Sequence, residues 1–178
     1  MNLFLSAKHW QLFIIFCGSA FLSDFVTTFS IFFNLLGVGV YLAWMYAISV
    51  GMQKMVPPPA KMNVTLFKVF FFIPAIYFIL ILIVMDYFTK SFGGPFSGRN
   101  ALIIVPVHLF SMFCIFYCLY FLAKAIKTVE LQRVVTFSDF FPEFLLAWFF
   151  PIGVWILQPR INKIIKQYEE SRENIVME

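Results

Sequence analysis

The sequence predicts an all-α membrane protein with four transmembrane helices, a C-terminal re-entrant hairpin and a short amphipathic surface helix. Two observations carry this prediction. First, 62% of the 178 residues are hydrophobic and 12% are charged, whereas a soluble domain typically carries about 25% charged residues. Second, the hydrophobic residues are gathered into five stretches, and the basic residues divide very unequally between the two sides if only four of these stretches cross.

The first transmembrane helix is predicted over residues 8–22. This stretch is short for a hydrocarbon core that takes about 20 residues to cross, but residues 3–5 can extend it. Ser23 and Asp24 then predict a tight turn, with Asp24 as the N-cap of the next helix.

The second helix is predicted over residues 25–53, long enough to cross the membrane with a tilt. Residues 56–61 include three consecutive prolines and should end it, because proline lacks the N–H that a helix interior needs.

The third helix is predicted over residues 64–87, with Pro74 as a kink. A turn-rich, glycine-containing loop follows at 91–98. The fourth helix is predicted over residues 100–124 and continues as a cytoplasmic stalk to residue 133. Residues 1–133 thus form the predicted four-helix bundle.

The basic residues decide which stretches cross. If all five crossed, seven basic residues would lie on one side and six on the other. If the fifth stretch instead enters and leaves on the same face, eleven of the thirteen share one side, and only Lys90 and Arg99 lie on the other. Because positive residues mark the cytoplasmic side, we expect four crossings, with both termini in the cytoplasm.

The fifth stretch, residues 137–157, has the features of a re-entrant hairpin. Asp139 can cap a helix that begins at residue 140 and rises only about half the bilayer before Pro151 and Gly153 reverse the chain. Pro159 then predicts the start of a separate basic amphipathic helix, in which Arg160, Lys163 and Lys166 contact anionic lipid headgroups. An acidic tail completes the predicted C-terminal module, residues 134–178.

The C-terminal part of the chain resembles known proteins. Residues 128–133 read TVELQR, and residues 148–162 read WFFPIGVWILQPRIN. Here the chain resembles a group of small, uncharacterised bacterial polytopic membrane proteins that share a WFFPIGxWxxQPRxN segment. The resemblance implies a C-terminal module that acts as a unit and nothing further. It implies no activity. We separately expect the protein in the inner (cytoplasmic) membrane of a bacterium.

The second predicted helix carries four small residues spaced by four. The series consists of Gly39, Ala43, Ala47 and Gly51. Small residues at this spacing allow two helix backbones to approach closely in a membrane. The series therefore predicts a helix-packing seam, used either within the chain or against a partner or a second copy.

A few polar side chains fall inside the apolar stretches. Asn34 and His108 lie at similar distances from the outer ends of their helices, and Ser111 follows His108 by one turn. Because polar residues are costly in lipid, they mark candidate intramembrane sites. Asn34 and His108 are interpreted as a hydrogen-bonded structural pair, with a proton or ligand site as the alternative.

The sequence contains no recognisable catalytic or metal-binding motif. Cys17, Cys114 and Cys118 have neither metal-binding spacing nor a disulfide framework, so we expect no metal, no cofactor and no enzymatic activity. The basic excess suits anionic lipid rather than nucleic acid. We expect a small accessory or scaffolding protein that packs laterally against another membrane protein or itself. The alternative is a small transporter or channel component with a polar site near Asn34 and His108.

Overall fold

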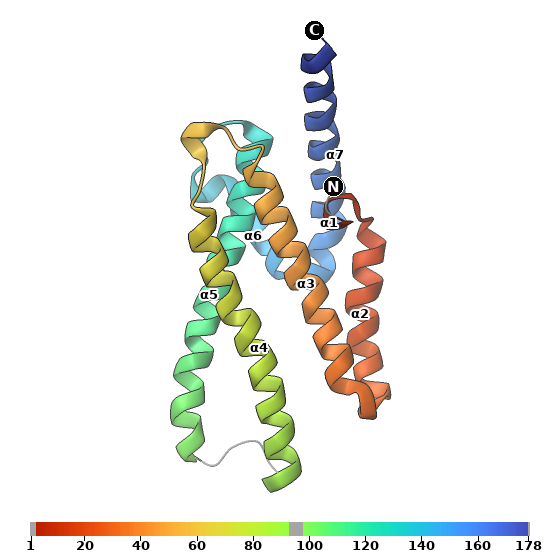
Figure 1. The fold of residues 1–178 in the computed structure, drawn as a ribbon, viewed down its shortest axis with the longest axis vertical. Helices are drawn as coiled ribbons and strands as arrows, with labels where there is room; N and C mark the ends of the chain where they lie inside the picture. Colours follow the sequence, from red (N-terminus) through yellow and green to blue (C-terminus); the bar gives the residue numbers. More distant parts are fainter. Residues whose placement is uncertain (1–2, 93–97, 178) are drawn as a thin grey trace. The chain divides into compact units, whose positions relative to one another are not determined.

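The computed structural model describes residues 3–92 and 98–177, which are almost entirely helical (Figure 1). The α-helices are α1 Leu3–Ser6, α2 His9–Phe25, α3 Ser30–Gln53, α4 Val64–Phe92, α5 Gly98–Leu131, α6 Phe137–Trp148 and α7 Phe150–Met177, with 3-10 turns η1 Thr27–Phe29 and η2 Pro58–Ala60.

Among the described residues, three segments are helical, long and apolar enough to cross a membrane: Ser30–Gln53, Pro58–Met85 and Ile104–Leu131. The all-helical fold and the multi-pass membrane protein are thus confirmed. The chain divides into two compact units. The first unit comprises Met1–Val64 and Leu119–Glu178, and the second unit comprises Thr65–Cys118.

In the first unit, α2 and α3 form an antiparallel hairpin. Gly37 of α3 lies so close to Ser19 of α2 that a Cβ atom at this position would collide with the serine Oγ. The turn comes later than predicted, since Ser23 and Asp24 belong to α2 and the chain reverses through η1. Ser23 stays inside the helix because its hydroxyl donates to the Ala20 carbonyl at 2.7 Å.

Residues 3–5 do not extend α2 but belong to α1, which is separated from it by Ala7 and Lys8. Lys8 is the N-cap residue of α2, and its backbone N–H donates a capping bond to the Gln11 side-chain oxygen at 3.0 Å. The N-terminal segment therefore has its own fixed position in the first unit.

The second unit contains most of α4 and the first part of α5. The ring of Phe70 packs against those of Phe113 and Tyr117, with centroids 6.2 and 4.7 Å apart. The proline-rich break between α3 and α4 is confirmed, while both helices of this unit continue through their prolines, Pro74 and Pro106. The loop predicted at 91–98 falls largely on residues 93–97, outside the described residues.

The C-terminal module folds as a helical hairpin. α6 ends at Trp148, the chain turns at Phe149, and α7 begins at Phe150. A Cβ atom at Gly153 would collide with the backbone carbonyl of Leu146, so glycine permits the close approach of α7 to α6. The reversal therefore comes before Pro151 and Gly153, which occupy the first turn of α7, where proline is tolerated.

α7 runs without interruption through Pro159. The separate amphipathic helix predicted from this proline is therefore the second half of α7. A proline inside a helix costs about 3 kcal/mol because it removes one backbone hydrogen bond and crowds the preceding turn. Burial of the neighbouring side chains of Leu157, Gln158 and Ile161, all 0% exposed, offsets this cost.

Candidate functional site

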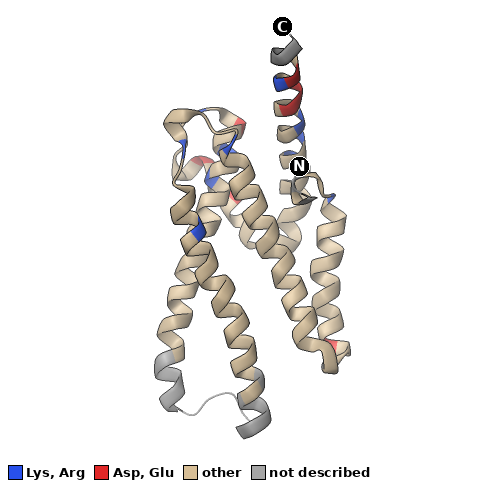
Figure 2. Cartoon of the chain, viewed as in Figure 1, with Lys and Arg blue, Asp and Glu red and all other residues tan. Residues whose placement is uncertain are grey.

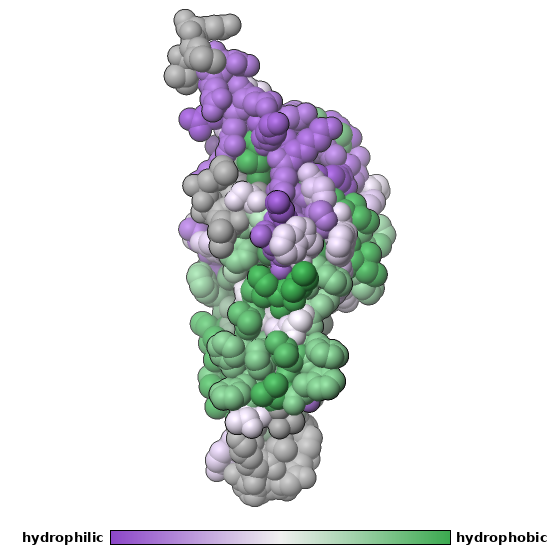
Figure 3. All heavy atoms as spheres, turned by 90° about the vertical axis from the view of Figure 1, so that its right-hand side faces the viewer, coloured by the Kyte–Doolittle hydropathy of each residue, from purple (hydrophilic) through white to green (hydrophobic). Residues whose placement is uncertain are grey.

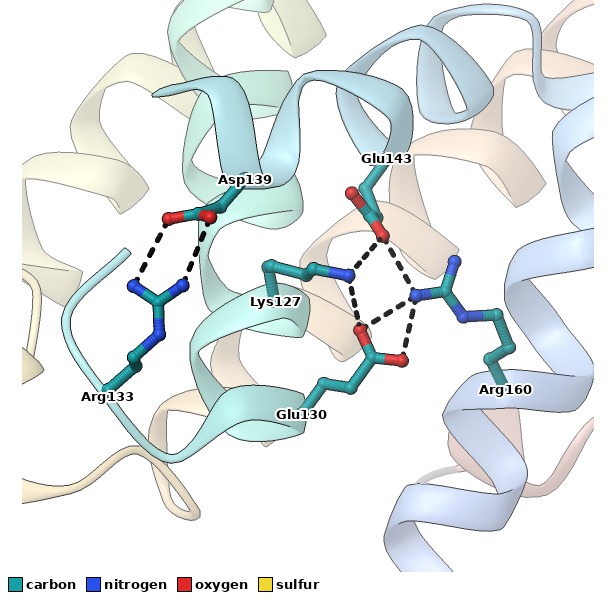
Figure 4. A network of polar contacts seen from close by, with 6 residues as sticks. All are labelled: Lys127, Glu130, Arg133, Asp139, Glu143 and Arg160. Carbon is teal, nitrogen blue, oxygen red and sulfur yellow. Dashed lines mark hydrogen bonds and ion pairs between the residues drawn. The ribbon is translucent and has the colours of Figure 1, made fainter. Parts of the chain in front are cut away.

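Four charged side chains from three helices form a compact cluster in the first unit (Figure 4). Lys127 and Glu130 come from α5, Glu143 from α6 and Arg160 from α7. The Arg160 Nη2 atom lies 2.8 Å from both Glu130 Oε2 and Glu143 Oε1. The Lys127 Nζ atom lies 2.9 Å from Glu130 Oε2 and 3.3 Å from Glu143 Oε1. Each cation therefore bridges both carboxylates.

This cluster is balanced in charge, which explains how Glu143 can be buried. Its side chain is only 2% exposed, and an isolated carboxylate at such a depth would be strongly destabilising. Lys127 and Arg160 neutralise it from two sides. The second carboxylate oxygen of Glu143, Oε2, has no hydrogen-bond partner among the described residues. The cluster thus fixes α6 and α7 to the end of α5.

A second ion pair fixes the start of α6. Asp139 accepts bonds from the backbone N–H and the hydroxyl of Thr136 at 2.8 and 3.0 Å, and Arg133 lies 3.1 Å away. The Thr136 hydrogen bonds, followed by the Arg133 guanidinium, lower the pKa of the Asp139 carboxyl. Asp139 thus acts in a capping box, with Thr136 as the N-cap residue.

Gln158 joins α7 to two other parts of the first unit. Its Oε1 accepts a bond from Trp44 Nε1 of α3 at 2.7 Å, and both side chains are 0% exposed. Its Nε2 donates to the backbone oxygens of Phe4 and Ala7 at 3.1 and 3.0 Å. Asn162 Nδ2 donates to the same Ala7 oxygen at 3.1 Å. These amides satisfy backbone carbonyls left free around α1.

Aromatic contacts also join α7 to α2 and α3. The ring of Phe150 lies 4.9 to 5.1 Å from those of Tyr41, Trp44 and Phe16. The Trp155 ring lies 4.7 Å from that of His9 on α2. The segment 148–162, singled out by the sequence, therefore carries many of the contacts that join the C-terminal hairpin to α2, α3 and α5.

The small-residue series on α3 divides into two parts. Gly51 and Ala47 are buried within the chain, Ala43 is half-buried and Gly39 is exposed. Apart from its chain neighbours and the backbone of its own helix, no heavy atom of the described residues lies within 4 Å of the position that a Cβ atom would take at Gly39. One end of the seam therefore packs inside the protein, whereas the other end is open.

The predicted polar residues fall in different units. Asn34 is exposed on α3 in the first unit, and His108 and the buried Ser111 belong to α5 in the second unit. His108 Nδ1 lies 3.0 Å from the hydroxyl of Tyr77 on α4, a partner that sequence reasoning missed. The pairing of Asn34 with His108 stays a prediction.

Of the residues predicted to contact headgroups, Arg160 lies in the charge cluster, while Lys163 and Lys166 are exposed. Sequence reasoning also missed the cluster roles of Lys127, Glu130 and Glu143. The position of Glu143 could have indicated its role. It is the one carboxylate in an otherwise apolar part of α6, and a carboxylate in such a place almost always has a partner that neutralises it.

Within the described residues, no group of three or more His, Cys, Asp or Glu side chains could hold a metal ion. No family model matches the chain, and no curated protein or solved structure matches it either.

Proposed function

We propose that this chain is a small accessory or scaffolding protein of a bacterial inner membrane, which binds another membrane protein through lateral helix packing. The observation that carries this proposal is the open end of the small-residue seam on α3. Gly39 belongs to a four-residue series whose other end, at Ala47 and Gly51, is buried, yet no side chain covers Gly39 itself. Small residues are favoured where two helices meet in lipid.

The surroundings of Gly39 suit a second transmembrane helix. Phe32 and Leu36 lie on the same face of α3, seven and three residues before Gly39, and are 60% and 40% exposed. A glycine beside larger side chains gives a partner helix access to the backbone, because small residues allow two helices to approach closely in a membrane. We therefore assign this face, the α3 open face, to a partner helix.

The polar groups of the first unit support a structural rather than a catalytic role. The charge cluster and Gln158 hold helices of the same chain together. Figure 3 shows the hydrophilic residues gathered where α7 ends, with hydrophobic residues over the next part of the same face. Contact with lipid or with partner helices is the chemistry available to such an apolar face.

Four crossings and a re-entrant hairpin complete the proposal. α2 has 17 residues and rises about 26 Å, close to the thickness of a hydrocarbon core. It runs antiparallel to α3, one of the candidate spans, and so can cross beside it. The 12 residues of α6 rise only about 18 Å, which suits a segment that enters the membrane and returns.

The orientation of the chain follows from its charges. Ala7 contacts Asn162, Arg160 contacts Glu130, and Met55 lines the same cavity as both charged residues. The start of α2 and the ends of α3 and α5 therefore lie at one end of the first unit, where the charged residues gather (Figure 2). We assign this basic end to the cytoplasm.

The test replaces Gly39 with leucine and follows the membrane proteins that co-purify in mild detergent. Gly18→Leu is a matched control, because a Cβ atom at Gly18 on α2 also meets nothing within 4 Å. We expect Gly39→Leu to lose a companion protein that the wild type and Gly18→Leu both retain. If the partner is a second copy, the same variant lowers the oligomer mass instead.

Identical companions and identical oligomer mass for all three proteins would overturn the proposal. The alternative, a transporter or channel component with a site near Asn34 and His108, then becomes the stronger hypothesis. It requires solute movement that the amide variants of His108 abolish.

A further inference from the structure

A polar cavity of about 600 Å³ lies between the end of α5 and the middle of α7. Its volume falls within the roughly 300–1,000 Å³ of typical small-molecule sites. Its lining includes the apolar side chains of Met55, Val129 and Ile164, called here the apolar wall, and the polar side chains of Arg160, Lys163 and Tyr168. A cavity lined by both apolar and cationic side chains suits an anionic amphiphile.

The position of this cavity along the chain places it at a membrane boundary. Met55 follows the candidate span Ser30–Gln53 by two residues, and Val129 and Glu130 lie at the end of the span Ile104–Leu131. Two crossings thus end at the cavity, where phosphate headgroups lie in a bilayer. The cavity is also at the basic end of the first unit, where anionic lipid is attracted.

Cationic side chains of the lining have hydrogen-bond donors available for a ligand. Arg160 makes its contacts with Glu130 and Glu143 through Nη2 alone. The other two guanidinium nitrogens make no contact with the other five residues drawn in the close-up (Figure 4). Lys163 forms no ion pair with any of the described residues. Glu130, the acidic residue of the lining, is already neutralised by Lys127 and Arg160.

From these observations we infer that the cavity binds the phosphate group of an anionic phospholipid. Lys163 and the free edge of Arg160 contact the phosphate, because a guanidinium and an ammonium both form charge-assisted bonds with phosphate oxygens. The Tyr168 hydroxyl hydrogen-bonds with the polar headgroup, and the apolar wall contacts the first methylenes of the acyl chains. This site is separate from the α3 open face.

Lys163 and Lys166 carry the same charge and lie one turn apart on α7, but their surroundings differ. Lys163 lines the cavity, whereas Lys166, three residues further along α7, does not line it and lies 3.7 Å from Glu170. General attraction of a basic helix to the membrane would use both lysines equally. A defined site uses Lys163.

The test measures how much phosphatidylglycerol each protein retains in native mass spectrometry, with phosphatidylcholine of the same acyl chains as the zwitterionic reference. Lys163→Gln and Lys166→Gln remove the same charge from exposed positions of one helix. We expect Lys163→Gln to bind phosphatidylglycerol about five-fold more weakly than the wild type, and Lys166→Gln to bind it like the wild type.

A second arm separates a lipid from a soluble phosphate ester. Glycerol 3-phosphate at millimolar concentration should leave bound phosphatidylglycerol in place, because it lacks the acyl chains that the apolar wall receives. The inference is overturned if both variants lose lipid equally, if neither loses it, or if glycerol 3-phosphate displaces the lipid. It is also overturned if phosphatidylcholine is retained as well as phosphatidylglycerol.

Discussion

Glu143 and Arg160 show how single residues determine the packing of the C-terminal hairpin. The two side chains meet at 2.8 Å although they are 17 positions apart in the sequence, and Glu130 reaches Arg160 across 30 positions. The pattern of residues 159–166 predicted that Arg160 contacts lipid headgroups, and in the structure its Nη2 atom contacts two carboxylates. Its partners could not be predicted, because helical periodicity says nothing about contacts between helices so distant in sequence.

Arg160→Met should destabilise the protein by about 3 kcal/mol, since loss of one partner leaves a buried carboxylate incompletely neutralised. Glu143 would keep only Lys127. Unfolding in mixed detergent micelles measures the effect. Lys166→Met is the control and should change the free energy of unfolding by no more than about 0.5 kcal/mol, because Lys166 is exposed. Equal stability of the two variants would show that the cluster contributes little.

Tyr77 and His108 should be coupled energetically through their 3.0 Å hydrogen bond. A double-mutant cycle with Tyr77→Phe and His108→Leu should give about 0.6 kcal/mol, the average for such bonds in membranes. A parallel cycle with Asn34→Leu tests the pairing predicted from the sequence. Coupling of similar size there would confirm that pairing, whereas additivity of Tyr77→Phe and His108→Leu would contradict the bond to Tyr77.

The helices themselves were largely predictable, because long apolar stretches and a triple proline leave few alternatives. The residues at which the helices begin and end were harder to predict. Ser23 could lie in a turn or remain inside a helix, and in the structure it lies inside α2, where its hydroxyl donates to the Ala20 carbonyl. Likewise, Pro159 could begin a helix or lie within one. Tertiary burial of Gln158 and Ile161 determined the outcome, and this burial cannot be read from local sequence.

The α6–α7 hairpin should depend on glycine at position 153. Gly153→Ala places a methyl group against the Leu146 carbonyl, and such overpacking typically costs about 1–3 kcal/mol. Gly39→Ala is the matched comparison, because its methyl group meets no neighbour and alanine is the better helix former. The unfolding free energy should therefore fall for the first variant and stay equal or rise for the second. The opposite order would rule out a close contact between α6 and α7.

At the scale of the whole molecule, the charge distribution and the folded hairpins support one orientation. The N-terminal segment, the end of α3, the end of α5 and the middle of α7 lie at one end of the first unit. If α6 and α7 form a re-entrant pair, the C-terminus leaves on the side where α5 ends. The same arrangement keeps eleven of the thirteen basic residues on a single side, which agrees with the preference of positive residues in short loops for the cytoplasm.

Three serines allow this topology to be tested with cysteine labelling of intact cells, after the native Cys17, Cys114 and Cys118 are replaced by alanine. A membrane-impermeant maleimide should label Ser97→Cys in intact cells, and Ser6→Cys and Ser171→Cys only after permeabilisation. Labelling of Ser6→Cys from outside would mean that α2 does not cross, because Ser6 lies three residues before the start of that helix. Labelling of Ser171→Cys from outside would mean that the α6–α7 segment crosses. The basic residues would then divide seven to six, and positive charge would no longer explain the orientation.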